Sequence, residues 1–170
     1  MEILSPFQIA FSLLFTLEPE LMGIISLSLG VSLAAVVLSL LIGLPFGAVL
    51  AAYSFKGRGA IIVVTNTLLG MPPVVVGLVI YLLVSRAGPF GFLGILYTPA
   101  AMMLAQTILV LPIAIALSRQ VFETLNTEYA PLFRSIGLGH NRWIATLVIE
   151  ARISLITIGL ACFGRAISEV

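Results

Sequence analysis

The chain has 170 residues, of which 61% are hydrophobic and 9% charged, and its mean hydropathy is +1.23. Soluble domains carry about 25% charged residues, so this composition excludes an ordinary water-soluble fold and indicates a polytopic membrane protein. Cys162 is the single cysteine, which excludes a disulfide framework and a thiolate metal site. The net charge of +1 does not point to a nucleic-acid partner, and we expect none.

Residues 1–20 form an N-terminal segment that differs from the rest of the chain. Residues 3–17 are apolar but too few to cross a bilayer comfortably, and Glu18, Pro19 and Glu20 close the stretch. The start Met1-Glu2 has no basic residues, so a secretory signal peptide is not predicted. We interpret the segment as extracytoplasmic or interfacial, with an additional crossing as the alternative.

Four apolar runs follow, at about 21–55, 60–85, 96–118 and 144–168. Each contains the roughly 20 residues that a helix needs to cross the hydrocarbon layer. Because backbone groups in lipid must pair within their own segment, these runs predict helices, and the fold class is an all-α membrane bundle. The fourth run is the least regular, since it contains Glu150, Arg152 and Arg165.

Basic residues concentrate on one side of the predicted bundle. Arg86 is the only one on the opposite side, which also carries Glu2, Glu18 and Glu20. The positive-inside rule therefore predicts an extracytoplasmic N-terminus and a cytoplasmic segment at 119–143. The cytoplasmic set is Lys56, Arg58, Arg119, Arg134 and Arg142, with Arg152 just inside the fourth run.

The cytoplasmic segment contains a predicted short helix. Asn126 is a suitable N-cap and Glu128 falls in the first turn, where Pro131 is also tolerated. An apolar face then repeats with helical spacing up to Gly137, which ends the helix, and a second short helix is predicted from about Asn141. The face either lies on lipid or offers Leu132 and Phe133 to a groove in a partner. Its members are Tyr129, Leu132, Phe133 and Ile136.

Two features inside the apolar runs indicate that these runs are not all straight, uncharged transmembrane helices. Pro72 and Pro73 must kink or break the second run, which makes them either a packing device or part of a gate. Arg165 and Glu169 are four residues apart, so they share one helix face and form either a structural ion pair or a gate element. Polar residues such as Gln106 either line a path or bond across helices. His140 has no neighbouring ligand, and no metal site is predicted.

Residues 128–137, Glu-Tyr-Ala-Pro-Leu-Phe-Arg-Ser-Ile-Gly, followed by Leu147-Val148-Ile149, resemble the cytoplasmic loop of permeases of binding-protein-dependent ABC importers (the MetI-like type). Pro131, Leu132 and Phe133 stand where that loop has Glu-Ala-Ala, and Glu150 replaces its final proline. Residues 70–77, 85–94 and 163–170 are similar to the tungstate branch of the family.

The resemblance implies a permease that imports tungstate, with molybdate or sulfate as alternatives. It implies a homodimer in a prokaryotic plasma membrane, an extracytoplasmic binding protein and a cytoplasmic ATP-binding subunit. No phosphate-binding loop is present, so we expect ATP and Mg²⁺ on the partner and no cofactor or enzymatic activity on this chain. Similar permeases continue for at least one more helix, so the chain resembles a truncated one.

The resemblance also assigns residue roles. It places ATPase coupling on Glu128, Tyr129, Leu132, Phe133, Ile136 and Gly137. The proline break and the charges at the end of the fourth run, rather than the resemblance, make Pro72, Pro73, Arg165, Ser168 and Glu169 the candidates for the translocation path or gate. From the residues alone, an ion-coupled secondary carrier and a membrane scaffold without transport activity remain alternatives.

Overall fold

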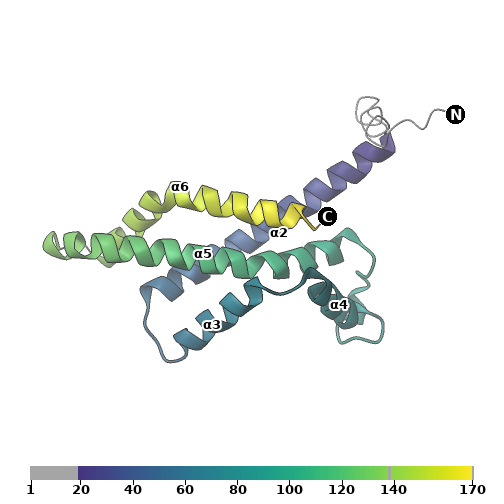
Figure 1. The fold of residues 1–170 in the computed structure, drawn as a ribbon, viewed down its shortest axis with the longest axis horizontal. Coiled ribbons are helices and arrows are strands. Elements are labelled where there is room, and N and C mark those ends of the chain that lie inside the picture. Colours follow the sequence, from purple (N-terminus) through teal and green to yellow (C-terminus); the bar gives the residue numbers. More distant parts are fainter. Residues whose placement is uncertain (1–18, 138, 170) are drawn as a thin grey trace.

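The computed structural model describes residues 19–137 and 139–169, and these ranges are almost entirely helical, with no strand among them (Figure 1). The prediction of an all-α membrane protein is confirmed. The interpretation of residues 1–20 lies outside the described residues, apart from Pro19 and Glu20, which begin the first described helix. The elements are α2 (Pro19–Ala52), α3 (Arg58–Leu69), α4 (Pro73–Val84), the 3-10 turn η1 (Gly91–Leu93), α5 (Pro99–Ser135) and α6 (His140–Ile167).

Three of these helices, α2, α5 and α6, are long and apolar enough to cross a membrane. The expected spans 21–55, 96–118 and 144–168 fall on them. Their outward faces carry large apolar side chains that a soluble protein would bury, such as Leu41 on α2 and Ile153 on α6. These faces are suited to contact lipid, and we treat the protein as a multi-pass membrane protein.

The second expected span, 60–85, is a bent pair of short helices rather than one continuous helix. The axes of α3 and α4 differ by 105°. Pro72 is extended (φ −64°, ψ 134°) and Pro73 is the first residue of α4. A residue before proline avoids the helical region, and proline is accommodated at the first helical position, so the Pro72-Pro73 pair ends one helix and starts another. The predicted break is confirmed. Each 12-residue helix extends about 18 Å, which is less than the hydrocarbon thickness of about 30 Å.

Among the described helices, α2 and α5 make the most extensive contact. The buried stripe of α2 includes Ser39, Gly43 and Gly47, so the backbones approach closely, as in a small-xxx-small interface. A Cβ on Gly47 would lie 1.9 Å from the Ser118 hydroxyl and 2.8 Å from the Ile115 carbonyl oxygen. The Ser39 hydroxyl donates to the Thr107 carbonyl oxygen at 3.1 Å across the same crossing. This contact orients α2 and α5 for the rest of the bundle.

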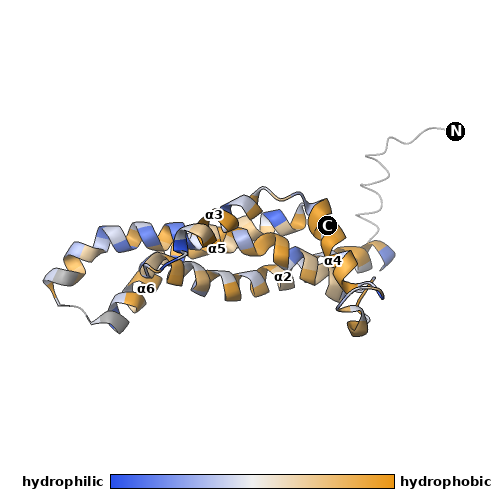
Figure 2. Ribbon diagram, turned by 90° about the horizontal axis from the view of Figure 1, so that it is seen from below, coloured by the Kyte–Doolittle hydropathy of each residue, from blue (hydrophilic) through white to orange (hydrophobic). Residues whose placement is uncertain are grey.

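Helices α5 and α6 form an antiparallel hairpin that projects beyond α2 and α3 (Figure 1). The 37 residues of α5 extend about 55 Å, well beyond the hydrocarbon layer. Figure 2 shows hydrophilic residues on the projecting part. We call the end around Gly137 the hairpin end, and the opposite end, with residues 85–98, the loop end.

The continuous α5 corrects the predicted helix start at Asn126. No glycine or proline interrupts residues 119–130, so the transmembrane helix continues through them to Ser135. Pro131 therefore lies in the last turns of α5 and not in a first turn. The Asn126 carboxamide oxygen accepts a hydrogen bond from the Trp143 indole N–H at 3.0 Å instead of capping a helix. Likewise, no separate short helix begins at Asn141, because α6 runs unbroken from His140 to Ile167.

An ion-pair cluster joins three helices where the hairpin leaves the bundle. Arg58, the first residue of α3, pairs with Glu123 of α5 and donates through Nε to the Leu50 carbonyl oxygen of α2 at 2.6 Å. Arg119 pairs with the same carboxylate at 2.5 Å. No sequence pattern indicated the contact between Glu123 and Arg58, because the two residues are 65 positions apart.

Replacing Gly47 by valine should destabilise the bundle, because two of the nearest atoms are rigid backbone atoms of α5. We expect a Tm in detergent at least about 5 °C lower, measured by thermal unfolding monitored by circular dichroism. Gly30→Val is the matched control on the same helix, since a Cβ on Gly30 would have no neighbour within 4 Å. Equal Tm values for the two variants would contradict the close crossing.

Candidate functional site

The hairpin end is a tight turn between two helices. The predicted helix end at Gly137 is confirmed: α5 ends at Ser135 and Gly137 adopts a left-handed backbone (φ 63°). Gly139 precedes the first residue of α6 with an extended backbone. The chain therefore reverses within a few residues at the point farthest from α2 and α3 (Figure 1).

The predicted apolar face of the hairpin divides into a buried and an exposed half. Phe133 is 3% exposed and stacks on Tyr129, with ring centroids 5.6 Å apart. Trp143 of α6 packs edge-on against Phe133 at 5.1 Å. Leu132 and Ile136 are 52% and 61% exposed. The expectation that Phe133 faces a partner is therefore corrected, since α6 folds back over that side of α5. Leu132 and Ile136 remain available.

Glu128 lies on a different side of the hairpin from this aromatic cluster. Its side chain is exposed and lines a shallow groove along α5 with Glu123, Thr124 and Thr127. The groove is acidic and polar, whereas Leu132 and Ile136 present an apolar surface. The projecting part of α5 thus offers two chemically different surfaces.

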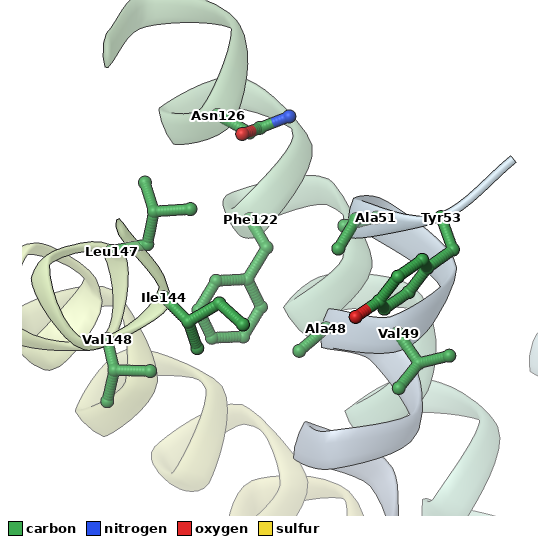
Figure 3. Close-up of a pocket in the computed structure, with 10 residues that line it drawn as sticks. Ala48, Val49, Ala51, Tyr53, Phe122, Asn126, Ile144, Leu147 and Val148 are labelled. Atoms are coloured by element: carbon green, nitrogen blue, oxygen red, sulfur yellow. The ribbon is translucent and has the colours of Figure 1, made fainter. Parts of the chain in front are cut away.

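An apolar cavity of about 200 Å³ lies at the base of the hairpin, between α6 and the end of α2 (Figure 3). Phe122 of α5 and Ile144 of α6 point into it, and Ala48 and Val49 of α2 form the opposite wall. Val49, Ile144 and Val148 are at least 41% exposed, so the cavity opens at the surface of the bundle between α6 and α2. No sequence pattern indicated this cavity, because it depends on how three helices meet.

At the loop end, Arg165 and Glu169 form the predicted ion pair, with an N–O distance of 3.0 Å. Both side chains are partly exposed. The Ser168 hydroxyl donates to the Arg165 carbonyl oxygen at 2.8 Å, which helps to close the last turn of α6. The three predicted gate residues of α6 thus lie together around the end of this helix.

A second cavity of about 200 Å³ joins the helix break to the end of α6. It brings together Pro73 and Glu169, two gate residues that were predicted on separate grounds. The other predicted gate residues, Pro72, Arg165 and Ser168, are not among its lining residues. The lining is completed by Val76, Gly77, Met102, Ala105, Gln106 and Leu109.

We call this second cavity the gate cavity, after the predicted gate residues Pro73 and Glu169 that line it. Gln106 is its buried polar residue. It is 7% exposed, and its amide nitrogen donates to the Ala166 carbonyl oxygen of α6 at 3.5 Å. Its amide oxygen has no hydrogen-bond partner among the described residues, and such a buried acceptor costs about 1–3 kcal/mol. The sequence left two interpretations of Gln106, a path-lining residue or a hydrogen bond across helices, and the structure shows the hydrogen bond. The packing around the end of α6 therefore leaves the Gln106 amide oxygen without a donor, and a movement of α6 could supply one.

Comparison with known proteins gives the family. Residues 43–169 match the family described as "Binding-protein-dependent transport system inner membrane component". The chain is 42% identical over 151 residues to a "Probable anion ABC transporter permease protein" of Haloferax volcanii, covering 88% of this chain and 65% of that protein.

Two further relatives are each named "Tungstate uptake system permease protein TupB". The protein of Peptoclostridium acidaminophilum is 33% identical, with 96% of this chain and 72% of the relative covered. The protein of Campylobacter jejuni is 37% identical, with 99% of this chain and 70% of the relative covered. The chain thus spans about two thirds of the length of these relatives, and it belongs to the family of inner membrane components of binding-protein-dependent transport systems.

Proposed function

We propose that this chain is the membrane-spanning permease subunit of an ATP-driven oxyanion importer, with tungstate as its anion. Family membership and the anion and tungstate permeases among its relatives support this proposal. The basic residues Lys56, Arg58 and Arg119 lie toward the hairpin end, whereas Arg86 and the paired Arg165 lie at the loop end. By the positive-inside rule, the hairpin end faces the cytoplasm.

The observation that carries the proposal is the projecting α5–α6 hairpin with Leu132 and Ile136 exposed near its tip. Exposed apolar side chains on a polar projection are suited to a groove in a soluble partner. The sequence has no phosphate-binding loop, so the partner that we propose is a separate ATP-hydrolysing subunit. A second copy of this chain and an extracytoplasmic binding protein complete the proposed importer.

In the proposed mechanism, nucleotide binding moves the hairpin, and the long helices carry the movement through the membrane. Helix α5 is continuous from Pro99 at the loop end to Ser135 at the hairpin end, and α6 ends at the gate cavity. Arg58 transmits the same movement to α3 through Glu123. We propose that opening separates Glu169 from Pro73 and so widens the gate cavity for the anion.

Leu132→Asp should abolish co-purification of the ATP-binding subunit, because a charge replaces an exposed apolar contact without disturbing the Phe133 core. Thr127→Asp is the control, since it adds the same charge on a different side of α5. We expect a loss of at least about tenfold in recovered ATPase for Leu132→Asp alone. Normal recovery with Leu132→Asp would contradict the docking assignment, and the absence of any ATPase with the unmodified chain would contradict an ATP-driven importer.

Glu169→Arg should disturb the gate, because two guanidinium groups would then face each other at the end of α6. We expect uptake to fall at least about fivefold and ATP hydrolysis to become independent of the binding protein. The double variant Arg165→Glu/Glu169→Arg restores the attraction and should recover uptake. Glu150→Arg is the charge-matched control on the same helix. If the double variant performs no better than the single one, the ion pair has no part in gating.

Uptake at nanomolar concentrations tests the choice of anion. Deletion of this gene should abolish ATP-dependent accumulation of tungstate and leave that of molybdate and sulfate largely intact. Equal dependence of tungstate and molybdate uptake on the gene would contradict tungstate selectivity. Uptake that follows an ion gradient without ATP would instead indicate a secondary carrier.

A further inference from the structure

The loop end contains a cavity that the proposed gate and docking surface leave unexplained. It has a volume of about 620 Å³, within the range of ligand-binding clefts. The segment 85–94 stood out in the sequence but has no role in the proposed mechanism. The cavity is lined by Tyr81, Val84, Ser85, Arg86, Ala87, Gly91, Gly94, Leu96 and Tyr97. We call it the Arg86 cleft.

The Arg86 cleft is built by a loop that folds tightly onto the end of α4. A Cβ on Gly88 would lie 2.1 Å from the Leu82 carbonyl oxygen, and one on Gly91 would lie 2.4 Å from that of Ser85. Tyr97 is the one non-glycine residue with a positive φ (63°) in the described ranges. Such a backbone is uncommon for a bulky residue. The loop is therefore held in a defined shape.

Arg86 is not required to complete α4. The last carbonyl groups of this helix already have donors: the Ser85 backbone N–H bonds Tyr81 at 2.8 Å, the Ser85 hydroxyl bonds Leu82 at 3.1 Å, and the Phe90 N–H bonds Leu83 at 2.9 Å. Within residues 19–137 and 139–169, Arg86 has no hydrogen bond or ion pair. Its guanidinium is thus free to bind a ligand.

The electrostatics of the Arg86 cleft favour an anion. None of its lining residues is acidic, and the sequence has no Asp or Glu between Glu20 and Glu123. Arg86 supplies a planar array of N–H donors, and the Tyr81 and Tyr97 hydroxyls are further potential donors. A guanidinium matches two oxygens of an oxyanion in a bidentate geometry. In contrast, the gate cavity contains the Glu169 carboxylate and the unpaired Gln106 oxygen, which disfavour a resting anion.

We infer that the Arg86 cleft is a weak binding site for a tetrahedral oxyanion at the loop end of the permease. This inference rests on the proposed function, which makes that end extracytoplasmic and the cargo an oxyanion. Helix α4 connects the two sites, because Tyr81 lines the cleft and Pro73 lines the gate cavity. Gly77, which also lines the gate cavity, precedes Tyr81 by four residues, so the two sites are about one helical turn, roughly 6 Å, apart along α4.

The phosphate of a lipid headgroup is a second tetrahedral oxyanion that could occupy the Arg86 cleft. Phe90 and Phe92 of the loop are exposed, as aromatic residues at the membrane interface are. The cleft is thus close to where headgroup phosphates lie. The bound group is a tetrahedral oxyanion in either case, and the experiment separates the two sources.

Equilibrium dialysis of the assembled permease and ATPase subunits against tungstate, without binding protein, tests the inference. We expect one tungstate per permease chain, with affinity at least about tenfold lower in Arg86→Gln and an intermediate loss in Arg86→Lys. Tyr97→Phe is a second variant that removes only a hydroxyl and leaves Arg86 in place. It should also weaken tungstate binding, so the test does not depend on the folding of Arg86→Gln alone. Lys56→Gln removes one exposed positive charge at the other end and should bind as the unmodified chain does.

The lipid arm uses native mass spectrometry with phosphatidylglycerol. In one outcome, the unmodified chain retains the lipid but does not bind tungstate, and Arg86→Gln retains less lipid. The oxyanion site would then stand, with a lipid headgroup as its occupant. Equal binding of both probes by Arg86→Gln and the unmodified chain would overturn the inference. If Arg86-dependent binding occurs but cells import no oxyanion, the proposed function fails and the site stands. If import proceeds normally in Arg86→Gln, and binding is unchanged, only the site fails.

Discussion

The close crossing of α2 and α5 is the contact on which the rest of the structure depends. Glycine at positions 43 and 47 lets the two backbones touch, and the Ser118 hydroxyl lies 3.2 Å from the Gly43 carbonyl oxygen. In lipid, helix association depends on such packing rather than on a hydrophobic driving force. The contact with α2 fixes the position of α5. Helix α5 in turn carries Gln106 at the gate cavity and Glu123 at the ion-pair cluster. One continuous helix therefore links both ends of the protein.

This arrangement explains how surfaces on opposite sides of a membrane can be coupled. The hairpin, which we propose as the docking site for an ATPase, is formed by the continuations of α5 and α6. The far end of α6 carries the ion pair of Arg165 and Glu169, beside the break at Pro73. The apolar cavity at the hairpin base opens at the surface between α6 and α2. A shift of the hairpin thus has a direct structural route to the gate cavity.

The sequence predicted those features that depend on local chemistry. Proline at 72 and 73 breaks any helix, and residues 165 and 169 share a face at helical spacing. It failed where distant segments decide the outcome. Phe133 is buried because α6 returns over it, which the spacing of apolar residues on α5 alone does not reveal. The contact of Glu123 with Arg58 also escaped detection, because the two residues are 65 positions apart. The Arg86 cleft is formed by one stretch, residues 81–97, but its shape depends on how that loop folds onto α4.

A distance measurement across the gate cavity tests the proposed coupling most directly. Spin labels at Val74, next to the helix break, and at Ser168, at the end of α6, report the separation of the two walls. In the assembled transporter, electron–electron double resonance should show this distance change when ATP binds to the partner subunit. The Leu132→Asp variant should show no change. An ATP-independent distance in a transporter that imports its anion would contradict the coupling of the hairpin to the gate.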